Sequence, residues 1–236
     1  MNILKKLSFH RTTARDYSFS VTKEERDVFC TTIINSSSPR TGFYLLIILS
    51  TFIVVTGIIR ESLILLIGGM LVAPLLSPIL SISLSLAIIN GKALLRSLLV
   101  FVISMLTTLI SAMAIGLMIE TDISQLSILE AIHFFDLSTL LIPIAAGAAA
   151  SFTWAKRELN GSLPGVAITV TLLPPLATMG LALAAGESRI FLDSLNIYFL
   201  NVSGIIIGSL IIFLMMGFQR SAKTVIAQVD LENKEK

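Results

Sequence analysis

The sequence predicts an all-α integral membrane protein of about six transmembrane helices, built as two inverted three-helix repeats. Three observations predict this fold class: the composition, the spacing of the apolar segments, and an internal repeat. Of 236 residues, 55% are hydrophobic and 14% are charged, and the mean hydropathy is +0.91. A soluble domain of this size could not bury so much apolar surface. The formal net charge is only +2, so nucleic acid is not expected as a partner.

Residues 1–40 are polar and contain no apolar run of the kind found in a cleaved signal peptide, so we expect the chain to insert through its own helices. Thr22 and Glu25 form a capping-box pattern, and apolar residues follow at helical spacing. This pattern predicts a short amphipathic helix, which either leads into the first span or lies on the membrane surface or a partner. Cys30, the single cysteine, is interpreted as a small apolar filler.

Six apolar segments are long enough to cross a hydrocarbon core of about 30 Å. No Asp, Glu, Lys or Arg lies inside any of them. The predicted organisation is a cytoplasmic segment (1–40), a first three-helix repeat (41–119), an acidic external loop (120–136), a second three-helix repeat (137–218) and a cytoplasmic tail (219–236). The six segments are residues 42–59, 62–89, 98–118, 137–155, 163–185 and 195–218.

The Lys and Arg residues predict the orientation, because cationic loops stay on the cytoplasmic side during insertion. Of 17, all but Arg60 and Arg189 lie in the terminal segments and in the loops at 90–97 and 156–162. The acidic loop 120–136 contains neither Lys nor Arg. We therefore expect both termini on the cytoplasmic side of a cell (inner) membrane. A rival topology, with four spans and two re-entrant hairpins at the proline-containing segments, fits these charges less well.

Residues 60–87 align without a gap on residues 157–184, an offset of 97, and ten of the 28 pairs are identical. Apolar composition alone would give about three identities; chance similarity of leucine-rich helices is the alternative explanation. Because each repeat has an odd number of spans, the second copy enters the membrane from the opposite side. Inverted repeats of this kind recur in secondary transporters, which is an analogy of fold only.

Prolines occupy corresponding places in the second and fifth spans. A proline removes a backbone donor and displaces a carbonyl one turn earlier, so both helices are predicted to break near the bilayer midplane. The freed groups must then face protein or a polar cavity, with amides suited to an anion and carbonyls suited to a cation. A kink that only improves packing is the alternative. The candidate solute or ion site comprises Pro74, Ser77, Pro78, Ser81, Thr171, Pro174, Pro175 and Thr178.

Asn201 is the remaining polar candidate inside a span, although an amide that bonds across a helix interface explains it equally well. Two dipeptides, Arg60-Glu61 and Arg157-Glu158, are interpreted as local ion pairs at helix ends, with a gating role as the alternative. Gly204 and Gly208, and the small residues around Gly147, predict packing faces and are weak indications of a dimer.

An enzyme is not expected, because membrane enzymes need ionisable or metal-binding groups and none lies inside the predicted spans. His133 stands beside two phenylalanines and is interpreted as an interfacial anchor. One cysteine without clustered histidines makes a Cys/His metal site improbable. We expect no metal and no cofactor.

Three stretches resemble a known family. They are IGGMLVAPLLSPIL at 67–80, AAGAAASF at 145–152 and LPGVAITVTLLPPLATMGLALAAG at 163–186. In this order they closely resemble domain of unknown function 389, a family of uncharacterised hydrophobic proteins, and the resemblance covers roughly residues 41–218. It implies a membrane protein and says little about a substrate. Many members carry a larger soluble N-terminal domain, whereas about 40 residues precede the first span here.

Two function classes follow. A transporter or channel for a small solute or ion predicts a polar cavity where residues 74–78 meet residues 171–175. A membrane scaffold or sensor that acts through its cytoplasmic segments predicts a dry, leucine-packed contact there. We prefer the first class. The expected partners are the lipid bilayer and the solute or ion, and the sequence leaves a homo-oligomer open.

Overall fold

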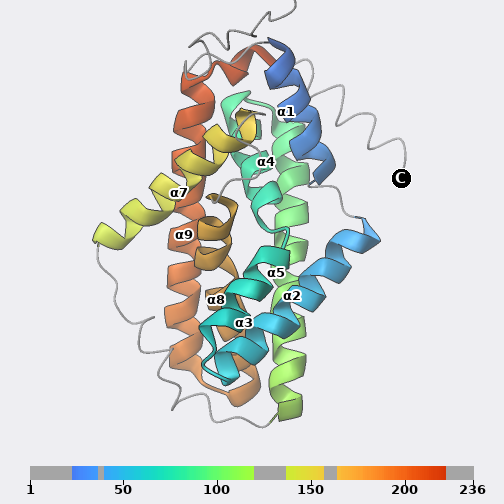
Figure 1. The fold of residues 1–236 in the computed structure, drawn as a ribbon, viewed down its shortest axis with the longest axis vertical. Coiled ribbons are helices and arrows are strands. Elements are labelled where there is room, and N and C mark those ends of the chain that lie inside the picture. The colour runs from blue at the N-terminus through green and yellow to red at the C-terminus, as the bar shows by residue number, and fades with distance from the viewer. Residues whose placement is uncertain (1–22, 37–39, 120–136, 157–163, 222–236) are drawn as a thin grey trace, which may run out of the picture.

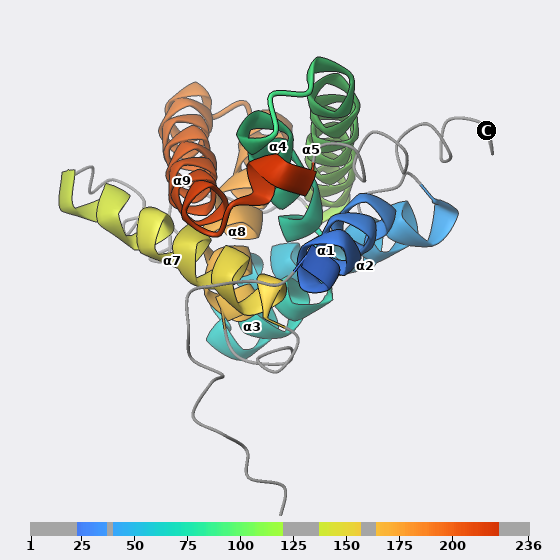
Figure 2. The same cartoon turned by 90° about the horizontal axis from the view of Figure 1, so that it is seen from above.

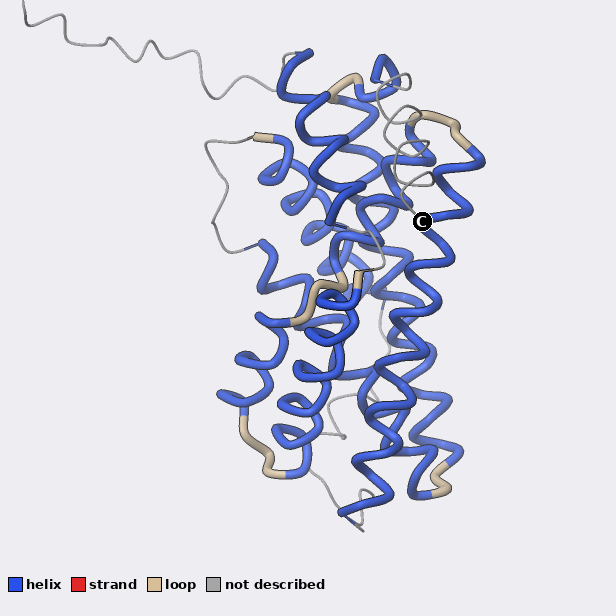
Figure 3. The backbone as a smooth tube through the Cα atoms, turned by 90° about the vertical axis from the view of Figure 1, so that its right-hand side faces the viewer, coloured by secondary structure: helices blue, strands red, loops and turns tan. Residues whose placement is uncertain are grey.

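The computed structural model describes residues 23–36, 40–119, 137–156 and 164–221 (Figure 1). Within these ranges the regular structure is helical, which confirms the predicted all-α class (Figure 3). The elements are α1 (Lys23–Ser36), α2 (Thr41–Ile59), α3 (Leu63–Val72), α4 (Leu76–Ala87), α5 (Gly91–Ile119), α7 (Leu137–Ala155), α8 (Pro164–Ala185), α9 (Ser188–Met215) and the short 3₁₀ helix η4 (Phe218–Ser221).

The two longest helices, α5 and α9, run along the two sides of the bundle (Figure 1). The shorter α2 and α7 cross the bundle at a slant; each begins part-way along the long axis, and they finish towards opposite ends (Figure 1). Seen from above, α4 and α8 lie between α5 and α9, and α2, α3 and α7 form a second layer (Figure 2). The packed contacts of α4 and α8 with these long helices place both proline motifs in the interior.

Among the described residues, three helices are long and apolar enough to cross a membrane: α2, α5 and α9. The pair α3 and α4 reaches this length together, with a bend of 53° between them. The parts of α7 and α8 whose side chains are described, Leu140–Ala155 and Leu172–Ala185, are apolar but shorter than this length. Helix α5 begins at Gly91, before the predicted segment 98–118, and so includes Lys92 and Arg96. Lys and Arg side chains are long enough to place their charged ends at the membrane interface while the backbone stays helical. The helix can therefore extend beyond the apolar segment.

Aliphatic side chains cover much of the outer surface. This is the pattern expected for helices that face lipid, because hydrocarbon does not penalise exposed apolar groups. On α2 and α5 the exposed residues include Leu45, Leu46, Ile48, Leu49, Phe52, Leu99, Val102, Ile103 and Leu106.

The predicted small-residue faces pack against each other inside the chain. A Cβ on Gly208 would collide with the carbonyl oxygen of Ile144, and one on Gly204 would lie 2.8 Å from Cγ of Pro143. A Cβ on Gly147 would collide with the backbone of Ile205. Ser209 also donates a hydrogen bond of 3.0 Å to the carbonyl of Gly147. These glycines therefore serve the contact between α7 and α9 within one chain.

Helix α1 matches the predicted short amphipathic helix, although Thr22 of the capping box lies outside the described residues. Its apolar face packs on α4, α7 and η4, and Cys30 and Ile33 are fully buried. The ring of Phe29 lies 5.4 Å from that of Phe213 and 5.1 Å from that of Phe218. Helix α1 is thus attached to the bundle through contacts within this chain.

The corners that follow α4 and α8 have the same backbone conformation, 97 residues apart. Ile89 has φ 55° and Gly186 has φ 75°. The amide of Asn90 donates to the carbonyl of Ser85 at 3.0 Å, and the amide of Glu187 donates to the carbonyl of Ala182 at 2.9 Å. Both corners therefore end with the hydrogen bond of a Schellman motif.

We expect Ile89→Gly to stabilise the protein by about 1 kcal/mol, because a β-branched residue is strained at positive φ and glycine is not. The Ile89 side chain is 91% exposed, so little packing is lost. Thermal unfolding in detergent measures the effect. Leu86→Gly, in the last turn of α4, is the control and should destabilise by a similar amount. A lower midpoint for Ile89→Gly would contradict the argument.

Candidate functional site

The predicted break in the first repeat lies at residues 73–75, between α3 and α4. Ala73 is extended, with φ −73° and ψ 123°, as expected for a residue that precedes a proline. Pro74 therefore ends α3. Pro78 stands in the first turn of α4, where its missing N–H would have no helical partner in any case. This accounts for the interruption by local chemistry alone.

The second repeat differs from the prediction. Helix α8 continues from Pro164 to Ala185 with Pro174 and Pro175 inside it, so the expected break in the fifth span is wrong for this conformation. Two adjacent prolines remove hydrogen bonds from a single turn, and the helix can continue on both sides of that turn. The repeat also has Thr171 at the position that corresponds to Pro74.

Leucines of the two proline motifs are buried in the same apolar clusters. Leu75 and Leu173 belong to one buried apolar cluster, and Leu76 and Leu172 belong to the other. Their exposed fractions are 4%, 0%, 7% and 0%, respectively. These leucines therefore lie among apolar side chains in this conformation, as a scaffold would require and unlike the polar cavity expected of an open transport site.

The buried polar side chains described inside the helices are hydroxyls. Most donate to the carbonyl four residues earlier in their own helix, as Ser85 does to Ser81 at 2.7 Å and Thr108 does to Ser104 at 3.0 Å. These bonds satisfy the hydroxyl without a ligand. A different bond joins two helices: Oγ of Ser81 on α4 lies 2.7 Å from Oγ of Ser97 on α5.

The corresponding positions of the second repeat also carry hydroxyls. Thr178 on α8 and Ser194 on α9 lie 97 residues after Ser81 and Ser97, and they are 1% and 0% exposed. The hydroxyl of Ser194 is buried without a hydrogen-bond partner. The sequence interpretation missed Ser97, which it assigned to a loop, and Ser194. Applying the offset of 97 to every hydroxyl could have found both.

The structure describes some of the remaining candidates. Ser77 is 6% exposed in the first turn of α4, and Asn201 is half-buried on α9. Arg60 and Glu61 are exposed at the turn between α2 and α3, where Glu61 has φ 49°. The side chain of Thr171, and the whole of Arg157 and Glu158, lie outside the described residues. No three of the described His, Cys, Asp and Glu residues are placed to hold a metal ion.

Long apolar helices that expose aliphatic side chains and bury hydroxyls are those of a helical membrane protein. This chain belongs to the family described as a domain of unknown function (DUF389), which matches residues 70–207. The resemblance expected from the three motifs is thereby confirmed. An uncharacterised protein of Methanocaldococcus jannaschii is 31% identical over 175 residues, which are 73% of this chain and 53% of that protein. The chain thus spans about half the length of that relative. No solved structure matches the chain.

Proposed function

We propose that this protein is a transporter or channel for a small solute or ion, with six spans in two inverted halves and both termini on the cytoplasmic side of the cell (inner) membrane. The internal repeat carries the proposal: residues 60–87 match residues 157–184, and the corner after α4 recurs with its hydrogen bond 97 residues later after α8, while a corner of the same kind also follows α2 at Glu61. Two such halves can exchange shapes and so expose a central site to each side in turn.

The arrangement of the helices supports inverted halves. Helices α5 and α9 begin 97 residues apart, and they run in opposite directions on opposite sides of the bundle (Figure 1). In the proposed halves, α2, α4 and α5 correspond to α7, α8 and α9. The contact between α2 and α5 then corresponds to the contact between α7 and α9. In the same way, the contact between α5 and α8 corresponds to the contact between α9 and α4. These pairs are the ones that a twofold axis would relate.

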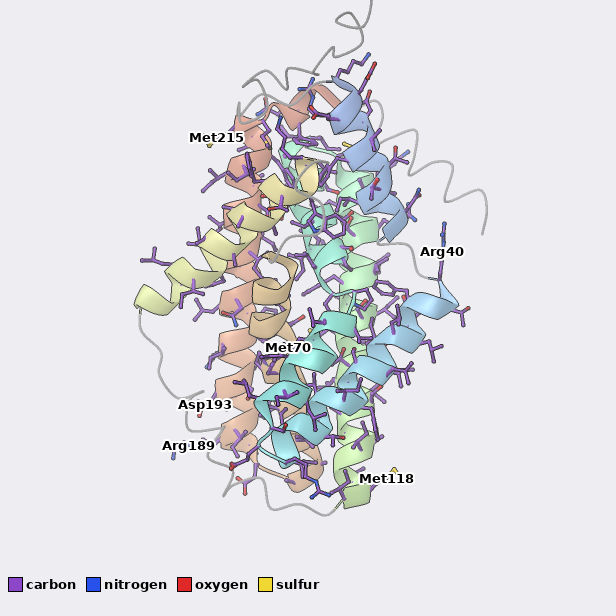
Figure 4. All side chains as sticks on the ribbon, viewed as in Figure 1. Arg40, Met70, Met118, Arg189, Asp193 and Met215 are labelled. Carbon is purple, nitrogen blue, oxygen red and sulfur yellow. The ribbon has the colours of Figure 1, made fainter. Side chains whose placement is uncertain are left out.

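The distribution of charge supports the orientation. Met118 and Arg189 lie at one end of the bundle, and Met215 lies at the other (Figure 4). Lys92 and Arg96 stand in the first turns of α5, at the end away from Met118. The 3₁₀ helix η4, whose sequence includes Arg220, packs against α1 and the end of α9 at that same end. The proposed cytoplasmic end is therefore the cationic one.

The chemistry of the interior suggests the class of ligand. Hydroxyls, and the backbone carbonyls in the last turn of α3 that the break at residues 73–75 leaves without helical donors, can coordinate a monovalent cation such as Na⁺ or bind a neutral polar solute. We propose no catalytic step, no cofactor and no nucleic acid as part of this function.

Cysteine labelling tests the proposal. Ser77→Cys and Thr171→Cys, each in a Cys30→Ser background, should react with a membrane-impermeant thiol reagent, and the accessible side should change with conditions. Arg60→Cys and Lys92→Cys report the two sides of the membrane. Leu106→Cys, on the outer face of α5, is the control that should stay unlabelled because hydrocarbon surrounds it.

A scaffold or sensor that acts through its cytoplasmic segments is the second candidate, and the packed contact of Leu75, Leu76, Leu172 and Leu173 favours it. A scaffold needs no hydrated route through this contact. Complete protection of Ser77→Cys and Thr171→Cys from both sides, in a folded protein, would therefore reject transport in favour of this candidate.

A further inference from the structure

The two repeats carry hydroxyls at the same positions but use them differently. In the first repeat, Ser97 donates to the carbonyl of Ala93 at 2.9 Å. Its single proton is then engaged, so Ser81 is the donor of the 2.7 Å bond between Ser81 and Ser97. In the second repeat the hydroxyl of Ser194 has no partner, although α8 and α9 pack against each other as α4 and α5 do.

A buried hydroxyl without a partner is costly, because it has lost water and gained no other hydrogen bond. Ser194 therefore destabilises the second half in this conformation, while Ser81 and Ser97 stabilise the first half. The same asymmetry appears in the helices: the first proline segment is bent by 53°, and the second is a continuous helix. The two halves thus differ in their hydroxyl bonding, and Pro74, which the second half lacks, adds a difference in helix shape.

We infer that the two hydroxyl pairs are made alternately: in a second conformation Thr178 bonds to Ser194, and the bond between Ser81 and Ser97 opens. Each half then adopts the interhelix hydroxyl bonding that the other half has here. A half with its interhelix hydroxyl bond formed is in the state of the first half here, and a half without that bond is in the state of the second half. This inference rests on the proposed transport function, for which it supplies the conformational exchange.

Disulfide trapping tests the inference. In a Cys30→Ser background, Ser81→Cys with Ser97→Cys forms one pair, and Thr178→Cys with Ser194→Cys forms the other. Both pairs should crosslink under mild oxidation in membranes, because a disulfide needs its two β-carbons within about 4.5 Å. Free thiols are counted by tagging the denatured protein with a maleimide polymer. Thr178→Cys with Ser209→Cys is the control; Ser209 lies about 22 Å further along α9 than Ser194, so no crosslink should form.

The variant with all four cysteines shows whether the two bonds exclude each other. The first disulfide should hold the protein in one state, so two thiols per chain should remain free after oxidation. Loss of all four thiols would overturn the inference, because both pairs would then be close at once. Failure of the second pair to crosslink, in a folded protein, would overturn it as well.

A second measurement uses a smaller change. Ser81→Ala removes the bond of the present state, so it should raise the rate at which Thr178→Cys and Ser194→Cys crosslink by about five- to tenfold, the ratio that one hydrogen bond typically gives. Ser83→Ala is the matched control, because Ser83 bonds only within α4, to the carbonyl of Ile79 at 3.1 Å. Equal rates in the two variants would count against the exchange.

These results separate the inference from the function on which it rests. If Ser77→Cys is labelled from both sides but the second pair never crosslinks, transport stands and the exchange of hydroxyl pairs falls. If the pairs crosslink alternately while Ser77→Cys and Thr171→Cys stay protected from both sides, the exchange stands and transport falls.

Discussion

Gly208→Ala is expected to destabilise the protein by about 3 kcal/mol, the upper part of the range for overpacking. The new methyl group would collide with the carbonyl oxygen of Ile144 and lie 2.9 Å from the amide nitrogen of Ala148. Both atoms belong to the backbone of α7, so no side-chain rotation can relieve the clash. We expect a marked fall in the thermal midpoint of the detergent-solubilised protein and early loss of the monodisperse peak.

Gly68→Ala is the matched control for this prediction. A Cβ on Gly68 would meet no atom within 4 Å, and alanine favours a helix over glycine by about 1 kcal/mol. The control should therefore unfold at the same or a higher temperature than the unchanged protein. If the two variants had equal midpoints, the close approach of α7 and α9 would not determine stability.

The proline motifs show how much of the site could be predicted from the sequence. The break at Pro74 follows from local sterics, because the residue before a proline avoids the helical region, and the sequence was sufficient to predict it. The continuity of α8 through Pro174 and Pro175 depends on how the surrounding helices hold that turn. The sequence interpretation applied identical reasoning to both motifs, although Thr171 stands where the first motif has Pro74, and so it did not separate them.

The hydroxyl pairs show a second limit. Ser97 follows Lys92 and Arg96, and counting apolar residues placed it in a loop, whereas α5 extends back to Gly91 and brings it beside Ser81. The partner of Ser97 lies on another helix, and pairing between helices depends on tertiary packing. Only the repeat could relate this pair to Thr178 and Ser194.

The docking of α1 shows a third limit. Its apolar face was predictable from spacing, but Phe29 packs on Phe213 and Phe218, almost two hundred residues away in the sequence. A helical pattern indicates that a face is buried and does not indicate what covers it. The sequence left three alternatives for this helix, and none of them included the contacts with α4, α7 and η4 of its own chain that the structure shows.

Phe29→Ala is expected to release α1 and expose Cys30 to thiol reagents. Phe29 is 3% exposed, and truncating a buried phenylalanine costs about 3 to 5 kcal/mol, more than one short helix is expected to retain in docking energy. Burial, with a smaller contribution from the charge of Asp27, raises the pKa of the Cys30 thiol from 9.0 to about 12, so little of the reactive thiolate forms near neutral pH.

Because a raised pKa shifts thiolate formation to higher pH, return of the thiol to its ordinary pKa should increase the labelling rate at pH 8 about a thousandfold. The rate is measured with a fluorescent maleimide, for which Cys30 is the single target. Val28→Ala is the control, since Val28 is 40% exposed on the other face of α1 and its truncation should leave Cys30 protected. Rapid labelling of the unchanged protein would mean that α1 is already released, and the aromatic contact between the first helix and the end of α9 would then contribute little to holding it in place.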